Sequence, residues 1–202
     1  MTDLLLFGRS SSQYTRLARM VAIEAGVPVV LRPIFDLGSL DPASYGENPA
    51  LKMPVLVDER GPLFGTENVC RELVRRSKRN DVVMRGEVGD RLVANAEELA
   101  LHVMASDVAV VLARLGSERP PLKALRSIEL CLDWLDARLD GLLATLPPRK
   151  TSFVEIALFC ATTHLPFREV MDVARWTSLG RFCARFAERE SASQTPYAFD
   201  RE

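Results

Sequence analysis

Three consecutive serines, Ser10, Ser11 and Ser12, are the residues whose type and position most suggest chemistry. They follow a predicted buried strand at residues 3–7 and precede a predicted helix that runs to about Ala25. A helix N-terminus carries partial positive charge, so hydroxyl groups there can help to hold an anion. A serine in this place is also a common N-cap, whose hydroxyl oxygen accepts a backbone N–H of the helix. The residues alone leave both interpretations open.

The helix and its flanking strands indicate a βαβ unit. Leu17 and Val21 lie on one face of the helix, and Gly26 follows its end, where glycine is favoured. A second strand over residues 28–31 should run parallel to the first, through a right-handed connection. The long connection 36–52 is rich in Gly, Pro, Asp and Ser, and such a loop is usually functional or partly helical.

The stretch from Asn48 to Asn68 contains the next four elements. Proline has no N–H to give to a sheet ladder, so Pro54 is expected at the start of a strand. The order predicted here is a loop ending at Met53-Pro54, a strand at 55–57, a turn at 58–62, a short strand at 63–64 and a helix that begins at Gly65-Thr66.

The second half of the chain gives only helical signals. A linker with two glycines, residues 81–89, precedes apolar residues at helical spacing over 92–116 and a second stripe over 125–142. Ser152 and Glu155 form a capping box before a third apolar helix. A last helix is predicted near residues 179–189, and the polar tail from Ser191 is expected to be loose.

Composition restricts the classes of function. With 26 Lys and Arg against 27 Asp and Glu, nothing favours binding to nucleic acid or a membrane surface. The four separated cysteines are typical of buried residues in a reducing compartment, which predicts a cytoplasmic protein. His102 and His164 are isolated from each other and from any cysteine spacing, so no metal site is expected.

Three segments in order resemble the glutathione S-transferase family, in its bacterial type. NPALKMPVLV is similar to the family's N-P-x-x-K-V-P-x-L segment, and SSSQYTRLARMVAIEAGV to its first helix; TSFVEIALFCATTHLPFR is similar to the capped core helix of its second domain. The resemblance implies a thioredoxin-like βαβαββα domain over residues 1–80, a linker at 81–89 and an all-helical domain over 90–202. It also implies a cis bond between Met53 and Pro54.

The family's chemistry is activation of the glutathione thiol, and the resemblance gives this role to Ser12. S-Q-Y-T-R-L-A-R is similar to the S-P-Y-V-R-K-V-R pattern of bacterial members, in which the first serine is catalytic. A free cysteine thiol has a pKa of about 8.5, and both a donated hydrogen bond and a helix N-terminus favour its ionised form. Gln13 replaces the family's frequent proline.

The resemblance also implies where glutathione is held. Met53 should offer its backbone N–H and C=O, Lys52 should reach the glycine carboxylate, and Thr66 should bind the γ-glutamyl carboxylate. Gly65 stands where the family has an acidic residue that meets the γ-glutamyl ammonium, and Glu67 is the possible substitute. The implied glutathione-binding residues are Ser12, Lys52, Met53, Pro54, Thr66 and Glu67.

The implied activity is addition of the glutathione thiolate to a small hydrophobic electrophile. Glutathione would be the co-substrate, without a metal, and the electrophile would lie in an apolar cleft between the domains, whose wall includes Met104 and Val108. The family also implies a homodimer. The alternative is a binding or scaffold protein of the same fold with weak or no catalysis, which Gly65 and Gln13 favour.

Overall fold

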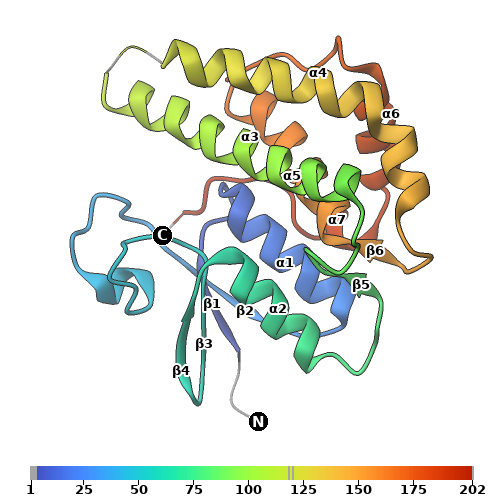
Figure 1. Ribbon diagram of the computed structural model, residues 1–202. Coiled ribbons are helices and arrows are strands. Elements are labelled where there is room, and N and C mark those ends of the chain that lie inside the picture. The colour runs from blue at the N-terminus through green and yellow to red at the C-terminus, as the bar shows by residue number, and fades with distance from the viewer. Residues whose placement is uncertain (1–3, 118, 120, 202) are drawn as a thin grey trace. The chain divides into compact units, whose positions relative to one another are not determined.

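The computed structural model describes residues 4–117, 119 and 121–201, and its chain forms two compact units (Figure 1). The first unit comprises residues 1–84, 149–151 and 190–202, and the second comprises 85–148 and 152–189. The first contains a four-stranded sheet and the second is helical, which confirms the predicted fold class.

The first unit is built on a mixed sheet of strand order β2-β1-β3-β4. β1 is parallel to β2, as the predicted βαβ unit requires, while β1 and β3 are antiparallel, as are β3 and β4. Its elements up to residue 84 are β1 (Leu5–Gly8), α1 (Gln13–Ala25), β2 (Val30–Pro33), η1 (Pro42–Tyr45), β3 (Val55–Asp58), β4 (Gly61–Phe64), α2 (Thr66–Arg76) and β5 (Val82–Val83).

The register of the sheet brings three connections to one edge. Phe7 near the end of β1 pairs with Val55 at the start of β3, and Val55 pairs with Phe64 at the end of β4. The loop after β1, the loop before β3 and the loop after β4 therefore meet at this edge. These are the segments with the serines, with Met53-Pro54 and with Gly65-Thr66.

The connection between β2 and β3 is less helical than the βαβαββα prediction. In place of a second α-helix it contains only the four-residue 3₁₀ helix η1. Asp41 caps the N-terminus of η1 and Pro42 occupies its first turn, while Gly46, with φ of 62°, ends it. Capping and termination signals so close together leave no room for a longer helix.

Residues 149–151 and 190–202, which the sequence analysis placed in the helical domain, lie in the first unit. β6 (Thr151–Ser152) begins where Thr151 donates its N–H to the carbonyl of Asp81 at 3.1 Å. The segment after Ser191 is not loose as predicted, because α7 (Glu190–Ser193) and Thr195 are held against α1. The side-chain contacts of α1 with this segment join residues 167 to 176 positions apart, so they have no local sequence signal.

In the described part of the second unit, the chain forms four helices. They are α3 (Arg91–Leu115), α4 (Leu122–Thr145), α5 (Phe153–Phe167) and α6 (Thr177–Phe186). The predicted stripe on α4 is buried from Ile128 to Leu142, and Ser152 caps α5 as predicted. Among the residues that the structure describes, no helix is long and apolar enough to cross a membrane.

An ion cluster joins the end of β3 to α2. Glu72 accepts hydrogen bonds from Arg75 and Arg76, each at 2.7 Å at its shortest, and from Arg60. Arg60 and Arg76 also pair with Asp58. The bonds from Arg75, reinforced by those from Arg76 and Arg60 and opposed by burial, lower the pKa of Glu72 from 4.5 to about 2.

We expect Glu72→Gln to lower the free energy of unfolding at pH 7, because the neutral side chain loses its ion pairs. The loss should be only about 1–2 kcal/mol, because the arginine partners are partly exposed and solvent screens the interaction. Since the folded-state pKa lies below the unfolded value, ionised Glu72 stabilises the fold above about pH 4.5. That contribution is lost as the pH falls from 4.5 toward 2. Urea unfolding of both proteins at pH 7 and pH 3 measures it.

Glu129→Gln is the matched control, because Glu129 forms an exposed pair with Arg126 on α4. An isolated pair of this kind contributes about 0.2–1 kcal/mol. A difference between wild type and Glu72→Gln that stays constant from pH 7 to pH 3 would contradict the prediction.

Candidate active site

Ser12 stands at the N-cap of α1 with an extended backbone, φ −95° and ψ 124°. Its hydroxyl oxygen accepts the N–H of Thr15 at 3.3 Å, so capping by Ser12 is real. A hydroxyl that accepts through its oxygen still has a proton to donate. Capping and contact with a thiolate are therefore compatible roles for the same side chain.

The loop that carries the serines is tightly built. Ser12 donates its N–H to the carbonyl of Arg9 at 3.1 Å, which closes a turn over Ser10 and Ser11. Ser11 is buried, while Ser10 and Ser12 are half-buried. A Cβ on Gly8 would lie 2.4 Å from the hydroxyl of Thr15, so only glycine lets the end of β1 approach the first turn of α1 this closely.

Met53-Pro54 is a cis peptide bond, as the family resemblance implies. The ladder between β1 and β3 starts at Val55, so the backbone of Met53 precedes it. Asn48 is buried and donates its side-chain amide to the carbonyl of Lys52 at 2.7 Å, which fixes the loop next to Met53. The side chain of Lys52 is exposed at this edge.

The start of α2 differs from the starts of α1 and α3. Gly65 is its N-cap residue, and no side chain in the described part of the chain caps α2. The caps of the other two helices are Ser12 and Asp90. Thr66, the first residue of α2, is half-buried and contributes both an N–H and a hydroxyl to this helix N-terminus. Such an N-terminus favours a carboxylate or another anion.

Glu67, the proposed substitute for the missing acidic residue, already has a basic partner. Arg71, one turn further along α2, donates to its carboxylate at 2.6 Å and 3.2 Å. Glu67 is half-buried and Arg71 is exposed. A ligand ammonium would therefore share this carboxylate with Arg71.

Met104 and Val108, the predicted wall of the electrophile site, both lie on α3 in the second unit. Met104 is fully buried and Val108 is half-buried. Their part in binding an electrophile stays a prediction, whereas the serine loop, Met53-Pro54 and the start of α2 meet at one edge of the sheet.

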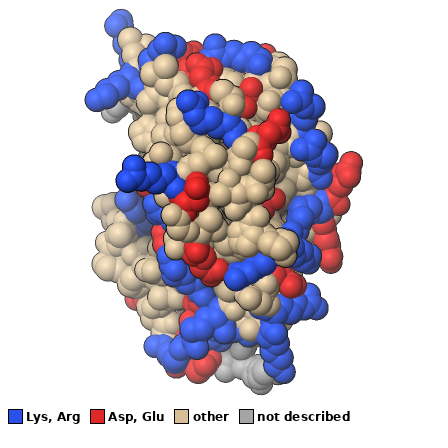
Figure 2. All heavy atoms as spheres, turned by 45° about the vertical axis from the view of Figure 1, so that its right-hand side comes forward, with Lys and Arg blue, Asp and Glu red and all other residues tan. Residues whose placement is uncertain are grey.

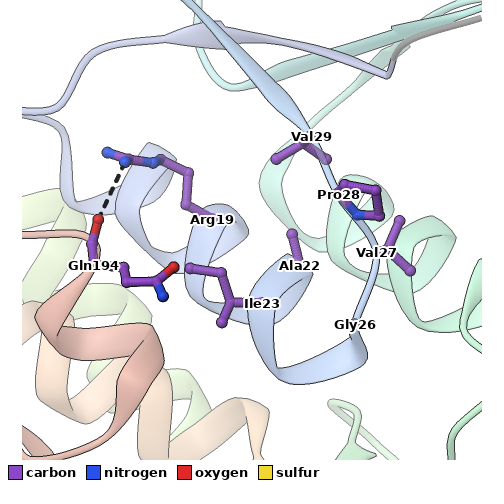
Figure 3. Close-up of a pocket in the computed structure, with 8 residues that line it drawn as sticks. All are labelled: Arg19, Ala22, Ile23, Gly26, Val27, Pro28, Val29 and Gln194. Atoms are coloured by element: carbon purple, nitrogen blue, oxygen red, sulfur yellow. Dashed lines mark hydrogen bonds between the residues drawn. The ribbon is translucent and has the colours of Figure 1, made fainter.

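A hollow lies beside the second half of α1, away from the serines (Figure 3). The side chain of Arg19 reaches across to the carbonyl of Gln194 at 3.5 Å, and Ile23 and Val27 add apolar surface. Its lining residues all differ from the predicted glutathione-binding residues: Arg19, Ala22, Ile23, Gly26, Val27, Pro28, Val29 and Gln194.

The sequence analysis missed Asp200. Its carboxylate accepts the N–H of Ser10 at 2.8 Å, although 190 residues separate the two. No motif surrounds Asp200, and a polar tail gives no indication of where it docks. Only the fold brings this acid to the serine loop.

Comparison with known proteins agrees with the geometry. Residues 6–80 match the family model described as the glutathione S-transferase N-terminal domain. A glutathione S-transferase from Methylobacillus flagellatus KT, solved with glutathione bound, is 23% identical and superposes with a TM-score of 0.81, over 97% of this chain and 100% of that one. No curated protein sequence matches the chain.

Two further solved structures give the same result. A glutathione S-transferase from Methylobacterium radiotolerans JCM 2831, in complex with glutathione sulfonate, is 24% identical with a TM-score of 0.78, over 100% of this chain and 98% of that one. A glutathione transferase family member from Pseudomonas fluorescens Pf-5 with bound glutathione is 23% identical with a TM-score of 0.80, over 97% and 100%. Residues 6–80 therefore match the glutathione S-transferase N-terminal domain family, and the whole chain has the fold of the solved glutathione S-transferases.

Proposed function

We propose that the protein is a glutathione transferase that adds the glutathione thiolate to a small hydrophobic electrophile. The observation that carries this proposal is the convergence of three backbone features at one edge of the sheet. They are the serine-capped start of α1, the cis Met53-Pro54 bond and the start of α2 at Gly65. The glutathione bound in the similar structures supports the choice of ligand.

Each feature has a separate task in this proposal. The backbone of Met53 pairs with the cysteinyl backbone of glutathione, and the N–H and hydroxyl of Thr66 hold the γ-glutamyl carboxylate at the start of α2. Lys52, exposed at the same edge, reaches the glycine carboxylate. The thiol then lies at the start of α1, where Ser12 donates a hydrogen bond and the helix end adds partial positive charge.

The reaction needs no other group from the protein than a stabiliser of the thiolate. Ser12 and the N-terminus of α1 lower the pKa of the bound thiol, so that more of it is ionised at neutral pH. The thiol proton passes to solvent and the thiolate sulfur forms a bond to the electrophilic carbon. In a substitution the electrons of the broken bond leave with the departing group, and in an addition the electrons of the π bond move into the electrophile. We propose that Val108 of α3, which is half-buried, contacts the electrophile, whereas Met104 has no exposed surface and would have to move to do so.

A binding or scaffold role is the second candidate, and one observation favours it. Gly65 has no carboxylate for the γ-glutamyl ammonium, and Glu67 is already paired with Arg71. Turnover of chlorodinitrobenzene with glutathione, measured beside a calorimetric titration of glutathione, separates the two. Turnover supports the transferase. Glutathione binding without turnover indicates a carrier or another class of electrophile. If the protein neither binds nor turns over glutathione, the scaffold role is supported and a glutathione-dependent function is contradicted.

We also propose a two-fold dimer, in which α2 and α3 contact the partner. Both charge signs occur side by side on the face shown in Figure 2, and a mixture of this kind makes a self-complementary contact possible. The charged residues on and near these helices include Arg71, Arg75, Arg76, Glu87, Asp90, Glu97 and Glu98. Light scattering at micromolar concentration should give about 45 kDa, twice the chain mass of 22.5 kDa. A mass of one chain would contradict the dimer.

A further inference from the structure

The C-terminal tail, residues 190–201, is tied to the middle and end of α1 by buried polar contacts. Ser191 is fully buried and donates its hydroxyl to the carboxylate of Glu24 at 2.6 Å. Glu24 is 2% exposed and also pairs with Lys150 at 3.1 Å. A buried carboxylate is stable only where it has polar or charged partners. The bond from Ser191 to Glu24 therefore holds the start of the tail against α1.

Arg16 fixes the next part of the tail. It is 6% exposed, donates to the carbonyl of Ala192 at 3.4 Å, and has its guanidinium 4.2 Å from the ring centre of Tyr197. Ser191, at the start of the tail, thus contacts Glu24 near the end of α1, and Tyr197, further along the tail, contacts Arg16 near the start of α1. The tail therefore runs antiparallel to α1, toward the serine loop (Figure 1).

Asp200 is where the tail reaches the serine loop. Its carboxylate accepts the N–H of Ser10 at 2.8 Å. Ser10 is the second residue of the turn that the bond from Ser12 to Arg9 closes. A backbone N–H bound to a carboxylate is a charge-assisted hydrogen bond, stronger than one between neutral groups. The tail is thus attached to the same turn that ends in Ser12.

We propose that Asp200 is a positioning residue of the thiol site, which holds the turn from Arg9 to Ser12 through the N–H of Ser10 so that the Ser12 hydroxyl faces the glutathione sulfur. This inference rests on the proposed transferase function. A displacement of about 1 Å at a reacting group can lower a rate by about 10²-fold, so an anchor on this turn has a direct effect on turnover.

The charge of Asp200 has its own effect on a thiolate, and the test must separate it from the hydrogen bond. A carboxylate near the start of α1 opposes a second negative charge there. The other charged groups on the segments that meet here are the cations Arg9, Arg16, Arg19 and Arg201 and the more distant carboxylates Glu24 and Glu190. Burial lowers the pKa of Arg19, and the nearby carboxylate of Asp200 opposes that shift.

Asp200→Asn and Asp200→Ala separate the two effects. The asparagine side chain keeps an oxygen that accepts the N–H of Ser10 but has no charge, whereas alanine has neither. Relative to Asp200→Asn, we expect Asp200→Ala to lower kcat with chlorodinitrobenzene by about tenfold and to leave KM for glutathione within about twofold. The apparent pKa of the bound thiol, from the pH profile of kcat, should be about half a unit to one unit higher in Asp200→Ala.

Glu190→Gln is the matched control, because it removes another carboxylate of the tail, one that bonds to Gln194. It should leave kcat and the pH profile at the wild-type values. Equal kcat and equal pH profiles for Asp200→Ala and Asp200→Asn would overturn the proposal, because the hydrogen bond would then have no part in catalysis.

The donor side of the bond gives an independent test. Proline has no N–H and is favoured at the second position of a turn, so Ser10→Pro removes the donor, and Ser10→Ala is its reference. If Ser10 and Asp200 act through one bond, the effects of Ser10→Pro and Asp200→Ala on kcat are not additive. Additive effects would contradict a shared bond.

Hydrogen exchange of the peptide that contains residues 9–12, measured without glutathione, separates failure of this inference from failure of the proposed function. Exchange should be faster in Asp200→Ala than in Asp200→Asn and unchanged in Glu190→Gln. If the wild-type protein neither binds nor turns over glutathione, the proposed function fails, and this exchange alone decides whether Asp200 holds the loop. Equal exchange in both Asp200 variants overturns the inference whatever the activity is.

Discussion

Ser12→Ala is expected to lower glutathione-dependent turnover by about 10²-fold or less while the protein remains folded. The hydroxyl of Ser12 caps α1 through its oxygen, so its proton is available to the thiolate. Removal of one comparable stabilising donor lowers kcat by about 10²–10³-fold. The pH profile of kcat should shift to higher pH, because the bound thiol loses a hydrogen bond that favours its ionised form.

The same substitution also removes a helix cap, which alone reduces stability by about 1 kcal/mol. Ser152→Ala is a matched control, because Ser152 caps α5 through a bond of the same length, 3.3 Å, to the N–H of Glu155. It should lose at least as much stability, measured by urea unfolding, because Ser152 is buried and also donates its hydroxyl to the carboxylate of Glu155 at 2.7 Å, and it should keep its turnover. If Ser152→Ala loses as much turnover as Ser12→Ala, the effect is one of folding.

The neighbouring serines decide whether the role belongs to Ser12. Unchanged turnover in Ser12→Ala, together with a loss in Ser10→Ala or Ser11→Ala, would move the hydrogen bond to a neighbour. Ser11 is 7% exposed and Ser12 is the N-cap, so the geometry favours Ser12. Unchanged rates in all three variants would contradict activation of the thiol by this loop.

Local signals were sufficient to predict most of the first unit. Gly26 ends α1 with φ of 68°, and Met53-Pro54 comes directly before β3, because glycine and proline restrict the backbone wherever they occur. The capping box at Ser152 and Glu155 likewise marked the start of α5. Each of these features depends on residues within a few positions of one another.

The parts that were missed depend on contacts between distant residues. α7 and the remainder of the tail are ordered because Glu24 and Arg16 of α1 bind them, and Asp200 reaches Ser10 across 190 positions. A polar, low-hydropathy segment looks the same in sequence whether it is loose or docked. The candidate site was therefore predictable where it consists of motifs, and not where the tail completes it.

Gly65 illustrates a further limit. The sequence was sufficient to align Gly65 with the family's acidic residue. It was not sufficient to predict the backbone conformation of Gly65, with φ of 88° and ψ of 133°. Residues with a side chain rarely adopt such angles, and forcing one to do so costs about 1–3 kcal/mol. Space is not the obstacle, because an added Cβ would meet only the amide nitrogen of Asn68, at 3.7 Å.

Gly65→Asp is expected to bind glutathione about ten- to a hundredfold more tightly than Gly65→Ala. The two variants carry the same backbone strain, so their difference isolates the carboxylate. A hydrogen bond to a charged group contributes about 1.5–3 kcal/mol, and each 1.4 kcal/mol is about tenfold in affinity. Analogues without the γ-glutamyl group should bind both variants equally, and calorimetric titration with circular dichroism of each variant measures affinity and folding.

Glu67→Gln shows whether the neighbouring acid has already taken the role that Gly65 leaves open. Glu67 is bound by Arg71, so an ammonium of glutathione would compete with a guanidinium for the same carboxylate. If Gly65→Asp binds no more tightly than Gly65→Ala while Glu67→Gln weakens binding, Glu67 is the partner of the γ-glutamyl ammonium. If Glu67→Gln leaves affinity unchanged and Gly65→Asp raises it, the wild-type site binds glutathione without that contact. If neither substitution alters affinity, the γ-glutamyl group does not lie at the start of α2, because any charge added or removed there would change its binding free energy.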